Sequence, residues 1–164
     1  MILTMKINIL KLKYSYKCDE ERGENRMMND NCIFCKLANG VFATNSIYED
    51  ENFNVILDVS PAAKGHALIL PKAHYADIHE MPSELLAEAI KVAQKVIKHA
   101  TPILGCDGYN VLQNNGAAAG QTVFHYHMHL IPRYENEESK GLLSWTPGSV
   151  TEDALKELRE QMKL

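Results

Sequence analysis

The stretch His125-Tyr126-His127-Met128-His129 decides the fold and directs the search for function. Histidine stands at every second position, and an extended strand would place all three imidazoles on one face. The residues beside them are large and apolar, which predicts that the opposite face packs into the core: Phe124, Tyr126, Met128 and Leu130. A surface strand that is polar by chance would explain one histidine better than three in register. Imidazole binds metal ions, transfers protons near neutral pH and attacks electrophiles, so the histidine face predicts a functional site.

The composition of the chain disfavours several classes of protein. With 164 residues and 46% hydrophobic content, it predicts one globular domain with a full core. Lys and Arg number 17 against 21 Asp and Glu, and this net charge of −4 disfavours a nucleic-acid partner. No apolar segment of the sequence is long enough to span a bilayer, so no membrane partner is expected. Lysines interrupt the apolar N-terminus, and four cysteines without a secretory signal predict reduced thiols or a metal site in a cytoplasmic protein.

Residues 1–28 differ from the remainder and are interpreted as a disordered or non-native extension, followed by a domain at 29–164. A Lys-rich apolar stretch passes into a charged run without clear periodicity. Part of that run, Glu21-Arg22-Gly23-Glu24, is what a purine-rich ribosome-binding site encodes when it is translated. The hypothesis is that translation begins at Met27 or Met28, and upstream peptides in the native protein would contradict it.

The pattern after the extension is that of an α+β domain. A hairpin is expected where two apolar runs flank the Pro- and Gly-containing turn 60–65. Ser83 is the expected N-cap of a long amphipathic helix, which Pro102 and Gly105 end. The predicted strands cover 46–58, 67–70, 109–113 and 122–131, and the predicted helices cover 83–100 and 151–163.

Cys32 and Cys35 have a spacing that lets both sulfurs reach one metal ion. A zinc site would need two more ligands, and His66, His74 and the histidines of 125–129 are candidates. Redox activity is a rival interpretation, disfavoured because no βαβ pattern surrounds the pair. Two buried thiols without a metal are another.

A loop of small residues leads directly into the histidine stretch. Asn114 and Gln121 stand at its ends as candidate hydrogen-bond anchors, while Gly120 and Thr122 supply a flexible amide and a hydroxyl. Such a loop can hold phosphate oxygens, although Gly- and Ala-rich loops more often only make turns.

Five motifs, taken in order, resemble the histidine-triad (HIT) proteins of the bacterial Hint-like branch. They are Cys32-Ile33-Phe34-Cys35-Lys36, Asp58-Val59-Ser60-Pro61 leading to Gly65-His66, Leu70-Pro71-Lys72-Ala73-His74, Asn114 to Thr122, and His125 to Arg133. The resemblance implies a homodimer of α+β subunits with the HIT-like fold. Each subunit would hold an antiparallel sheet of about five strands, one long helix and a C-terminal helix.

The resemblance also implies a nucleotide hydrolase or transferase that cleaves at the α-phosphate of a purine nucleotide conjugate. His127 would be the nucleophile that carries a transient nucleotidyl group, and His129 would contact the phosphate or relay a proton. His66 would lie close to the triad, and Asp58 would bind the ribose. The other nucleotide-binding residues implied are those of the loop: Asn114, Gly120, Gln121 and Thr122.

Family members with this pair of cysteines bind zinc. The resemblance therefore implies a closed structural zinc site of Cys32, Cys35, His74 and His125. His125 belongs to the catalytic triad by sequence, but the metal would fix its ring and leave His127 and His129 for chemistry. No organic cofactor is implied.

Two other functions fit the residues. The three triad histidines could form a catalytic metal site with a bound water as nucleophile, or the pocket could bind a nucleotide without turnover and report it to a partner. The leaving group is not determined, because phosphoramidates, acyl adenylates and dinucleoside polyphosphates present the same α-phosphate. The segment Ser144-Trp145-Thr146-Pro147-Gly148 could touch it across a dimer, or Trp145 could simply pack.

Overall fold

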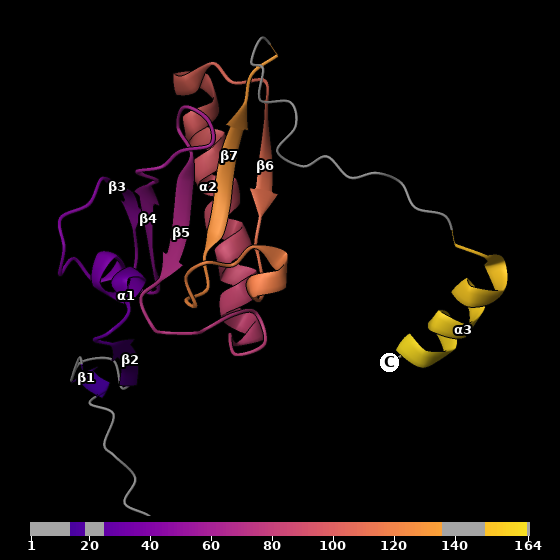
Figure 1. Ribbon diagram of the computed structural model, residues 1–164. Helices are drawn as coiled ribbons and strands as arrows, with labels where there is room; N and C mark the ends of the chain where they lie inside the picture. Colours follow the sequence, from indigo (N-terminus) through magenta and orange to yellow (C-terminus); the bar gives the residue numbers. More distant parts are fainter. Residues whose placement is uncertain (1–13, 19–24, 136–149, 164) are drawn as a thin grey trace, which may run out of the picture.

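The computed structural model describes residues 14–18, 25–135 and 150–163. Its central sheet is antiparallel, with strand order β3-β4-β5-β7-β6 (Figure 1). The strands are β3 (Ser46–Glu49), β4 (Phe53–Leu57), β5 (Ala67–Pro71), β6 (Gly108–Leu112) and β7 (Met128–Arg133). The helices in the described residues are α1 (Ile33–Ala38), α2 (Ser83–Leu104) and α3 (Glu152–Met162), with a 3₁₀ turn at Ala117–Ala119. The predicted α+β class is confirmed.

Alternating side chains give the sheet two buried faces. On β5, Ala67 and Ile69 belong to a core that includes the apolar face of α2, whereas Leu68 and Leu70 pack with α1. Each large aliphatic side chain buried in this way stabilises the fold by about 1.5–3 kcal/mol. The α2 residues in the first core are Ala89, Val92, Ala93 and Val96. Since Leu68 lies opposite His129 in the β5–β7 ladder, His129 projects from the face that α1 partly covers.

The long helix α2 extends further than its sequence predicts. Pro82 is the N-cap and Ser83 is the first helical residue, so the helix begins one position earlier than an N-cap at Ser83 would place it. The helix includes Pro102 and ends at Leu104, because a proline in the last turn removes one backbone donor while the preceding turns stay bonded. Gly105 then closes the helix in the left-handed conformation, at φ 64°, and donates to the carbonyl of Thr101.

The predicted strand at 46–58 is wrong in one respect, since it is a hairpin. Asp50 interrupts it: its Oδ1 accepts hydrogen bonds from the N–H groups of Asn52 and Phe53, at 2.8 and 2.7 Å. Short acidic side chains favour such turns because they bond their own following backbone. The hairpin predicted between the next two strands is confirmed as β4 and β5.

The predicted strand at 122–131 is also wrong over its first half, because β7 begins at Met128. The N–H of Tyr126 donates to the carbonyl of Tyr75, and the Pro71 carbonyl lies 3.0 Å from His125 Nε2 instead of joining the ladder. Pro71 has no N–H to offer a neighbouring strand. Phe124, predicted to be part of the core, is 54% exposed for the same reason.

Outside the central sheet, β1 (Tyr14–Cys18) and β2 (Asn25–Asn29) pair as an antiparallel ladder. The rest of the predicted extension lies outside the described residues, so its division from the domain stays a prediction. The C-terminal helix α3 begins as predicted, because Thr151 accepts a hydrogen bond from the N–H of Ala154. No helix in the described residues is long and apolar enough to cross a membrane.

Candidate functional site

Helix α1, which the sequence did not predict, carries three residues of the site and is tied to the sheet by two asparagines. The side-chain amide of Asn39 donates to the carbonyls of Cys35 and Lys72, at 2.9 and 2.8 Å. The buried Asn54 of β4 donates to the carbonyls of Leu37 and Ala38, at 3.5 and 3.4 Å. These bonds hold the short helix against β4 and β5 although six residues alone would not form a stable helix.

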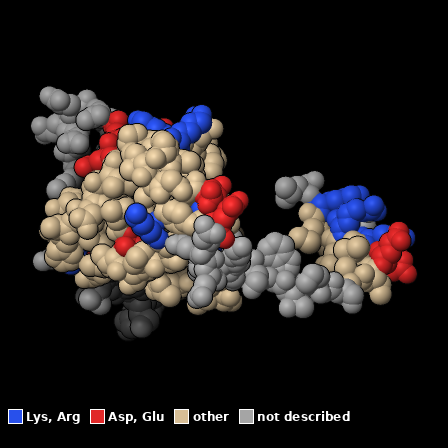
Figure 2. All heavy atoms as spheres, turned by 90° about the horizontal axis from the view of Figure 1, so that it is seen from above, with Lys and Arg blue, Asp and Glu red and all other residues tan. Residues whose placement is uncertain are grey.

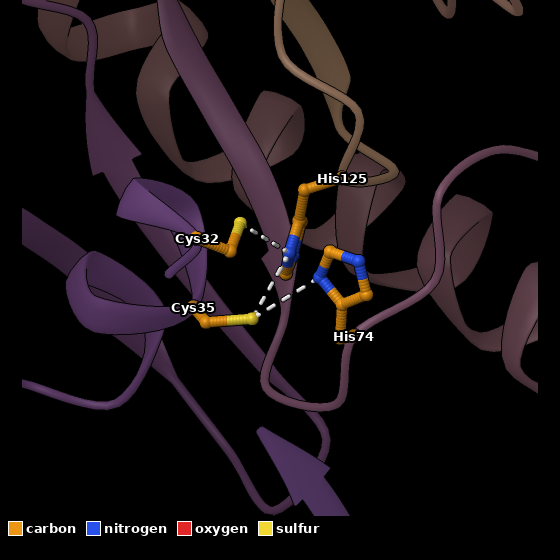
Figure 3. A group of neighbouring side chains, drawn as sticks. All are labelled: Cys32, Cys35, His74 and His125. Atoms are coloured by element: carbon orange, nitrogen blue, oxygen red, sulfur yellow. Dashed lines mark hydrogen bonds between the residues drawn. The ribbon is translucent and has the colours of Figure 1, made fainter. Parts of the chain in front are cut away.

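Cys32, Cys35, His74 and His125 converge at one end of the sheet (Figure 3). The Nδ1 of His125 lies 3.5 Å from the sulfur of Cys32 and 3.4 Å from that of Cys35. The Nδ1 of His74 lies 3.3 Å from the Cys35 sulfur. The predicted four-residue set is therefore brought together, with its donor atoms within 4.8 Å of one another.

The geometry of this group fits a tetrahedral metal ion. Around zinc, metal–sulfur and metal–nitrogen bonds of about 2.3 and 2.0 Å separate the two donor atoms by about 3.5 Å. His125 Nε2 lies 3.0 Å from the Pro71 carbonyl, which orients Nδ1 toward the sulfurs. The Cys35 thiol donates to the Cys32 sulfur, which lowers the pKa of Cys32 and raises that of Cys35. One sulfur is thus readily available as a thiolate, the form that binds metals.

His127 is buried and held by the backbone of His125. Its Nδ1 donates to the His125 carbonyl at 2.7 Å, so the neutral ring keeps an unprotonated Nε2. Burial lowers the pKa of His127, and the bond to the carbonyl opposes that shift. An uncharged imidazole with a free ring nitrogen is a competent nucleophile near neutral pH.

His129 and His66 form a chain that begins at a backbone amide. The N–H of Ala62 donates to His66 Nδ1 at 3.1 Å, so in neutral His66 the proton sits on Nε2. His66 Nε2 donates in turn to His129 Nδ1 at 2.9 Å. His129 is therefore left with its proton on Nε2, as a donor beside His127: the centroids of the two rings are 5.0 Å apart.

Asp58 provides negative charge beside this chain, with Oδ2 3.6 Å from His66 Nδ1. Burial lowers the pKa of His66, and the Asp58 charge opposes it. Burial, followed by the charges of His127 and His66, lowers the pKa of His129 to about 4. The three histidines are therefore mainly neutral near physiological pH.

A pocket of about 360 Å³ opens beside His127 and His129, large enough for a small molecule. Its apolar lining comes from α1, β4, β5 and the turn after β4: Phe34, Leu37, Ile56, Val59 and Leu68. Asp58 and Thr122, both predicted to bind the nucleotide, line it as well. Phe34 was not predicted as part of the site, and its ring meets those of His125 and His127 edge-on, with centroids 6.1 and 5.0 Å away. Its place between the two cysteines was the available signal.

The other loop residues predicted to bind the nucleotide are not part of the pocket lining in the described residues. They are Asn114, Gly120 and Gln121. The amide of Gln121 is occupied within the fold, accepting from Gly116 and donating to the carbonyls of Ala76 and Val123. This amide braces the loop, and contact of these three residues with a substrate stays a prediction.

The three triad histidines do not converge on one point. Within the described residues, two groups could hold a metal ion, and neither contains all three. His125 faces the cysteines while His127 and His129 face the pocket. The second group, Asp58, His66 and His129, has His66 Nδ1 accepting from a backbone amide, so its Nε2 carries a proton and disfavours a metal. The geometry therefore gives little support to a three-histidine catalytic metal.

Residues 39–136 match the family described as the HIT domain. The chain belongs to the HIT-domain family. It is 39% identical over 132 residues to the adenosine 5'-monophosphoramidase HNT1 of Saccharomyces cerevisiae, covering 80% of each chain. It is 36% identical over 141 residues to the adenylylsulfatase HINT3 of Arabidopsis thaliana, covering 86% of this chain and 69% of that one. The family and fold predicted from the sequence motifs are confirmed.

Solved HIT structures are similar over the described domain. A HIT family protein from Bacillus anthracis superposes with a TM-score of 0.73 at 38% identity, covering 81% of this chain and 95% of that one. A Zn-bound histidine triad family protein from Mycobacterium smegmatis gives a TM-score of 0.64 at 38% identity, covering 79% and 91%. The site described above thus lies in a HIT fold, and its homologues include hydrolases of nucleotide conjugates.

Proposed function

We propose that this HIT-family chain hydrolyses purine nucleotide conjugates at the α-phosphorus, with His127 as the nucleophile. The observation that carries the proposal is the 2.7 Å hydrogen bond from His127 Nδ1 to the His125 carbonyl. It fixes one tautomer and presents Nε2 to a pocket of nucleotide size. The substrate class is supported by the relatives named adenosine 5'-monophosphoramidase and adenylylsulfatase.

The reaction has two steps. His127 Nε2 attacks the α-phosphorus, a nitrogen–phosphorus bond forms, and the bond from phosphorus to the leaving group breaks with its electron pair on the leaving atom. His129 Nε2–H donates a hydrogen bond to a phosphate oxygen and stabilises the negative charge there, while the amine or oxygen leaving group takes its proton from water. A second water then attacks phosphorus and gives up one proton to the solvent. The bond from phosphorus to His127 Nε2 breaks, which releases His127 and the nucleoside monophosphate.

The leaving group is the least constrained part of the substrate. A phosphoramidate, an acyl adenylate and a dinucleoside polyphosphate all present the same phosphorus to His127. Asp58 and Thr122 both line the pocket. In this proposal the Asp58 carboxylate accepts hydrogen bonds from the ribose hydroxyls, and the Thr122 hydroxyl donates to a phosphate oxygen. The predicted contact of Trp145 with the leaving group falls on residues 136–149, outside the described residues.

Zinc is the metal proposed for the Cys32, Cys35, His74 and His125 group. Two sulfurs and two imidazoles are a donor set that zinc prefers, and four protein ligands make a closed, structural site. The Zn-bound relative from Mycobacterium smegmatis supports this assignment. The homodimer and the cytoplasmic location stay predictions. On the face shown in Figure 2, basic side chains have acidic ones beside them, both on the domain and on α3.

The proposal is tested by hydrolysis of adenosine 5'-phosphoramidate, with the release of AMP as the measured quantity. His127→Ala is expected to lose turnover by a factor of about 10⁴ or more while it still binds AMP. His99, an exposed residue of α2, supplies a control, because His99→Ala also removes one histidine but leaves the pocket unchanged. Wild type quenched in denaturant at alkaline pH, where the phosphorus–nitrogen bond to histidine survives, should carry an adenylyl group on His127, detected by peptide mass spectrometry.

The outcomes separate the three functions. Absence of turnover on every nucleotide conjugate, with AMP bound, would favour the non-catalytic binding module. Loss of turnover on mild chelation, restored by metal and without unfolding, would favour a catalytic metal. Survival of turnover under mild chelation, together with the His127 adduct, supports the proposal.

A further inference from the structure

Two polar residues stand at the far, otherwise apolar end of the pocket. Thr44 is half-buried and Asn45 is exposed, and both line the pocket. Within residues 25–135, no hydrogen bond of the structure engages either side chain. A polar side chain that lines a ligand pocket with its hydrogen-bonding capacity unused is suited to fix the orientation of a ligand.

The strand register places these residues opposite the catalytic histidines. His129 on β7 pairs with Leu68 on β5, Leu68 pairs with Ile56 on β4, and Ile56 pairs with Ser46 on β3. Neighbouring strands lie about 4.8 Å apart, so three steps put Ser46 roughly 14 Å from His129. Thr44 and Asn45 directly precede Ser46, at the end of this row.

Alternation along β3 indicates which side chain faces the pocket. Ser46 Oγ donates to Asn54 Oδ1 at 2.7 Å, so Ser46 lies on the face of the sheet that α1 covers. The backbone before it stays in register, because the N–H of Leu57 donates to the Asn45 carbonyl at 2.9 Å. Two residues before Ser46, Thr44 lies on the same face and points to the pocket, while Asn45 lies at the rim.

We propose that Thr44, with Asn45, selects the base of the substrate, and that it prefers a purine with a hydrogen-bonding group at C6. This inference rests on the proposed function: with the α-phosphorus at His127, the nucleoside extends over Leu68 and Ile56 and brings its base to Thr44. A hydroxyl and an amide each donate and accept. They therefore satisfy the amino group and N1 of adenine, or the oxygen and N1–H of guanine. Unsubstituted purine keeps N1 as an acceptor but has no hydrogen-bonding group at C6, so one of these bonds is lost.

The test compares 5'-phosphoramidates of adenosine and of purine riboside, which lacks the C6 amino group. Wild type is expected to prefer the adenosine substrate by about tenfold in kcat/KM, the value of one or two neutral hydrogen bonds. Thr44→Val keeps the shape of the side chain and should bring that preference to about one by raising KM for adenosine alone. Thr44→Ser should keep the preference, and Asn45→Ala should weaken it.

Thr122 provides a matched control, since it is the other threonine that lines the pocket and, in the proposed function, it binds the phosphate and not the base. Thr122→Val is expected to slow both substrates equally. A wild type without preference, or a Thr44→Val variant that slows both substrates equally, would overturn the base-selection proposal while the hydrolase stands. If neither substrate is hydrolysed, the proposed function fails, and calorimetry with AMP and purine riboside 5'-monophosphate decides base selection by the same comparison.

Discussion

His66 and His129 are joined by a hydrogen bond of 2.9 Å between Nε2 of the first and Nδ1 of the second, 63 positions apart in the sequence. His66 is only 5% exposed, so water competes little for this bond. Because Ala62 fixes the protonation of His66, the bond leaves the proton of neutral His129 on Nε2, which makes that nitrogen the donor. His66 is therefore a positioning residue for His129.

Replacing His66 tests this role. His66→Leu should lower kcat on adenosine 5'-phosphoramidate by about 10²-fold, the lower end of the range for loss of a hydrogen-bond donor to a developing oxyanion, with a smaller change in KM. His66→Gln should lose less, because its amide N–H can donate to His129 Nδ1. Steady-state kinetics with His99→Leu as a control distinguish these outcomes. Equal losses of kcat in the two His66 variants would show that the hydrogen bond donated to His129 Nδ1 does not support turnover.

The pH dependence of turnover should follow the buried nucleophile. Burial lowers the pKa of His127, so the acid limb of kcat/KM should lie below pH 6.5, the ordinary value for histidine. The charge of Asp58 raises the pKa of His127, His129 and His66. Asp58→Asn removes that charge and should move the acid limb to still lower pH. Movement to higher pH in a pH–rate profile would contradict the electrostatic role of Asp58.

The same burial makes stability depend on pH. The pKa of His129 is about 4 in the folded protein and near 6.5 when unfolded, so between these values the unfolded chain binds more protons. The contribution of neutral His129 to the free energy of unfolding is fully present above pH 6.5 and is lost as the pH falls toward 4. Urea unfolding at intervals over this range should show the decline, and His129→Gln, which does not titrate, should show a shallower one. If the free energy of unfolding falls equally steeply with pH in both proteins, His129 is not a source of the pH dependence.

Local patterns predicted the elements with strong, uninterrupted periodicity. The strand β6, the strand β5 and the helix α3 lie close to where sequence placed them. One of the two incorrect strand predictions has a local cause and the other a tertiary cause. The hairpin bend at Asp50 depends on side-chain bonds to its own backbone, and the non-strand course of 122–127 depends on partners from Tyr75 and Pro71. Neither is visible in alternation alone.

The candidate site was likewise predicted from the sequence only in part. Motif order and resemblance brought together the four candidate metal ligands and the pair His127 and His129. The alternation argument put all three triad histidines on one strand face, whereas His125 precedes β7 and turns toward the cysteines. The pocket wall was not predictable residue by residue, because Phe34 lies on a helix that is held by Asn39 and Asn54 rather than by its own propensity.

Metal removal should act on stability before it acts on chemistry. The candidate zinc ligands join α1, the loop after β5 and the segment before β7, so a bound ion holds together parts distant in sequence. Free zinc at about a thousand times its dissociation constant would contribute about 4 kcal/mol to the free energy of unfolding. Chelation should therefore lower the Tm measured by calorimetry, while hydrolysis survives as long as the chain stays folded. Cys35→Ser should show the lowered Tm without chelator, whereas Cys106→Ser, a buried thiol outside the group, should still respond to it. A Tm unchanged by chelation in all three proteins would contradict the metal assignment.

Phe34 should link the metal group to the nucleophile through packing alone. Its ring meets His127 edge-on at 5.0 Å and also lines the pocket. It therefore restrains the imidazole and, in the proposed function, contacts the nucleoside of the substrate. Phe34→Leu keeps an apolar side chain but loses the ring edge, and it should raise KM for the adenosine substrate by about tenfold and broaden the His127 ring signals in NMR spectra. Zinc affinity should stay near wild type, because Phe34 supplies no donor atom. Phe42→Leu, at a 44% exposed phenylalanine nearby in sequence, should change none of these quantities. Loss of zinc affinity in Phe34→Leu, without change in KM, would show that the ring serves α1 alone and not the nucleophile.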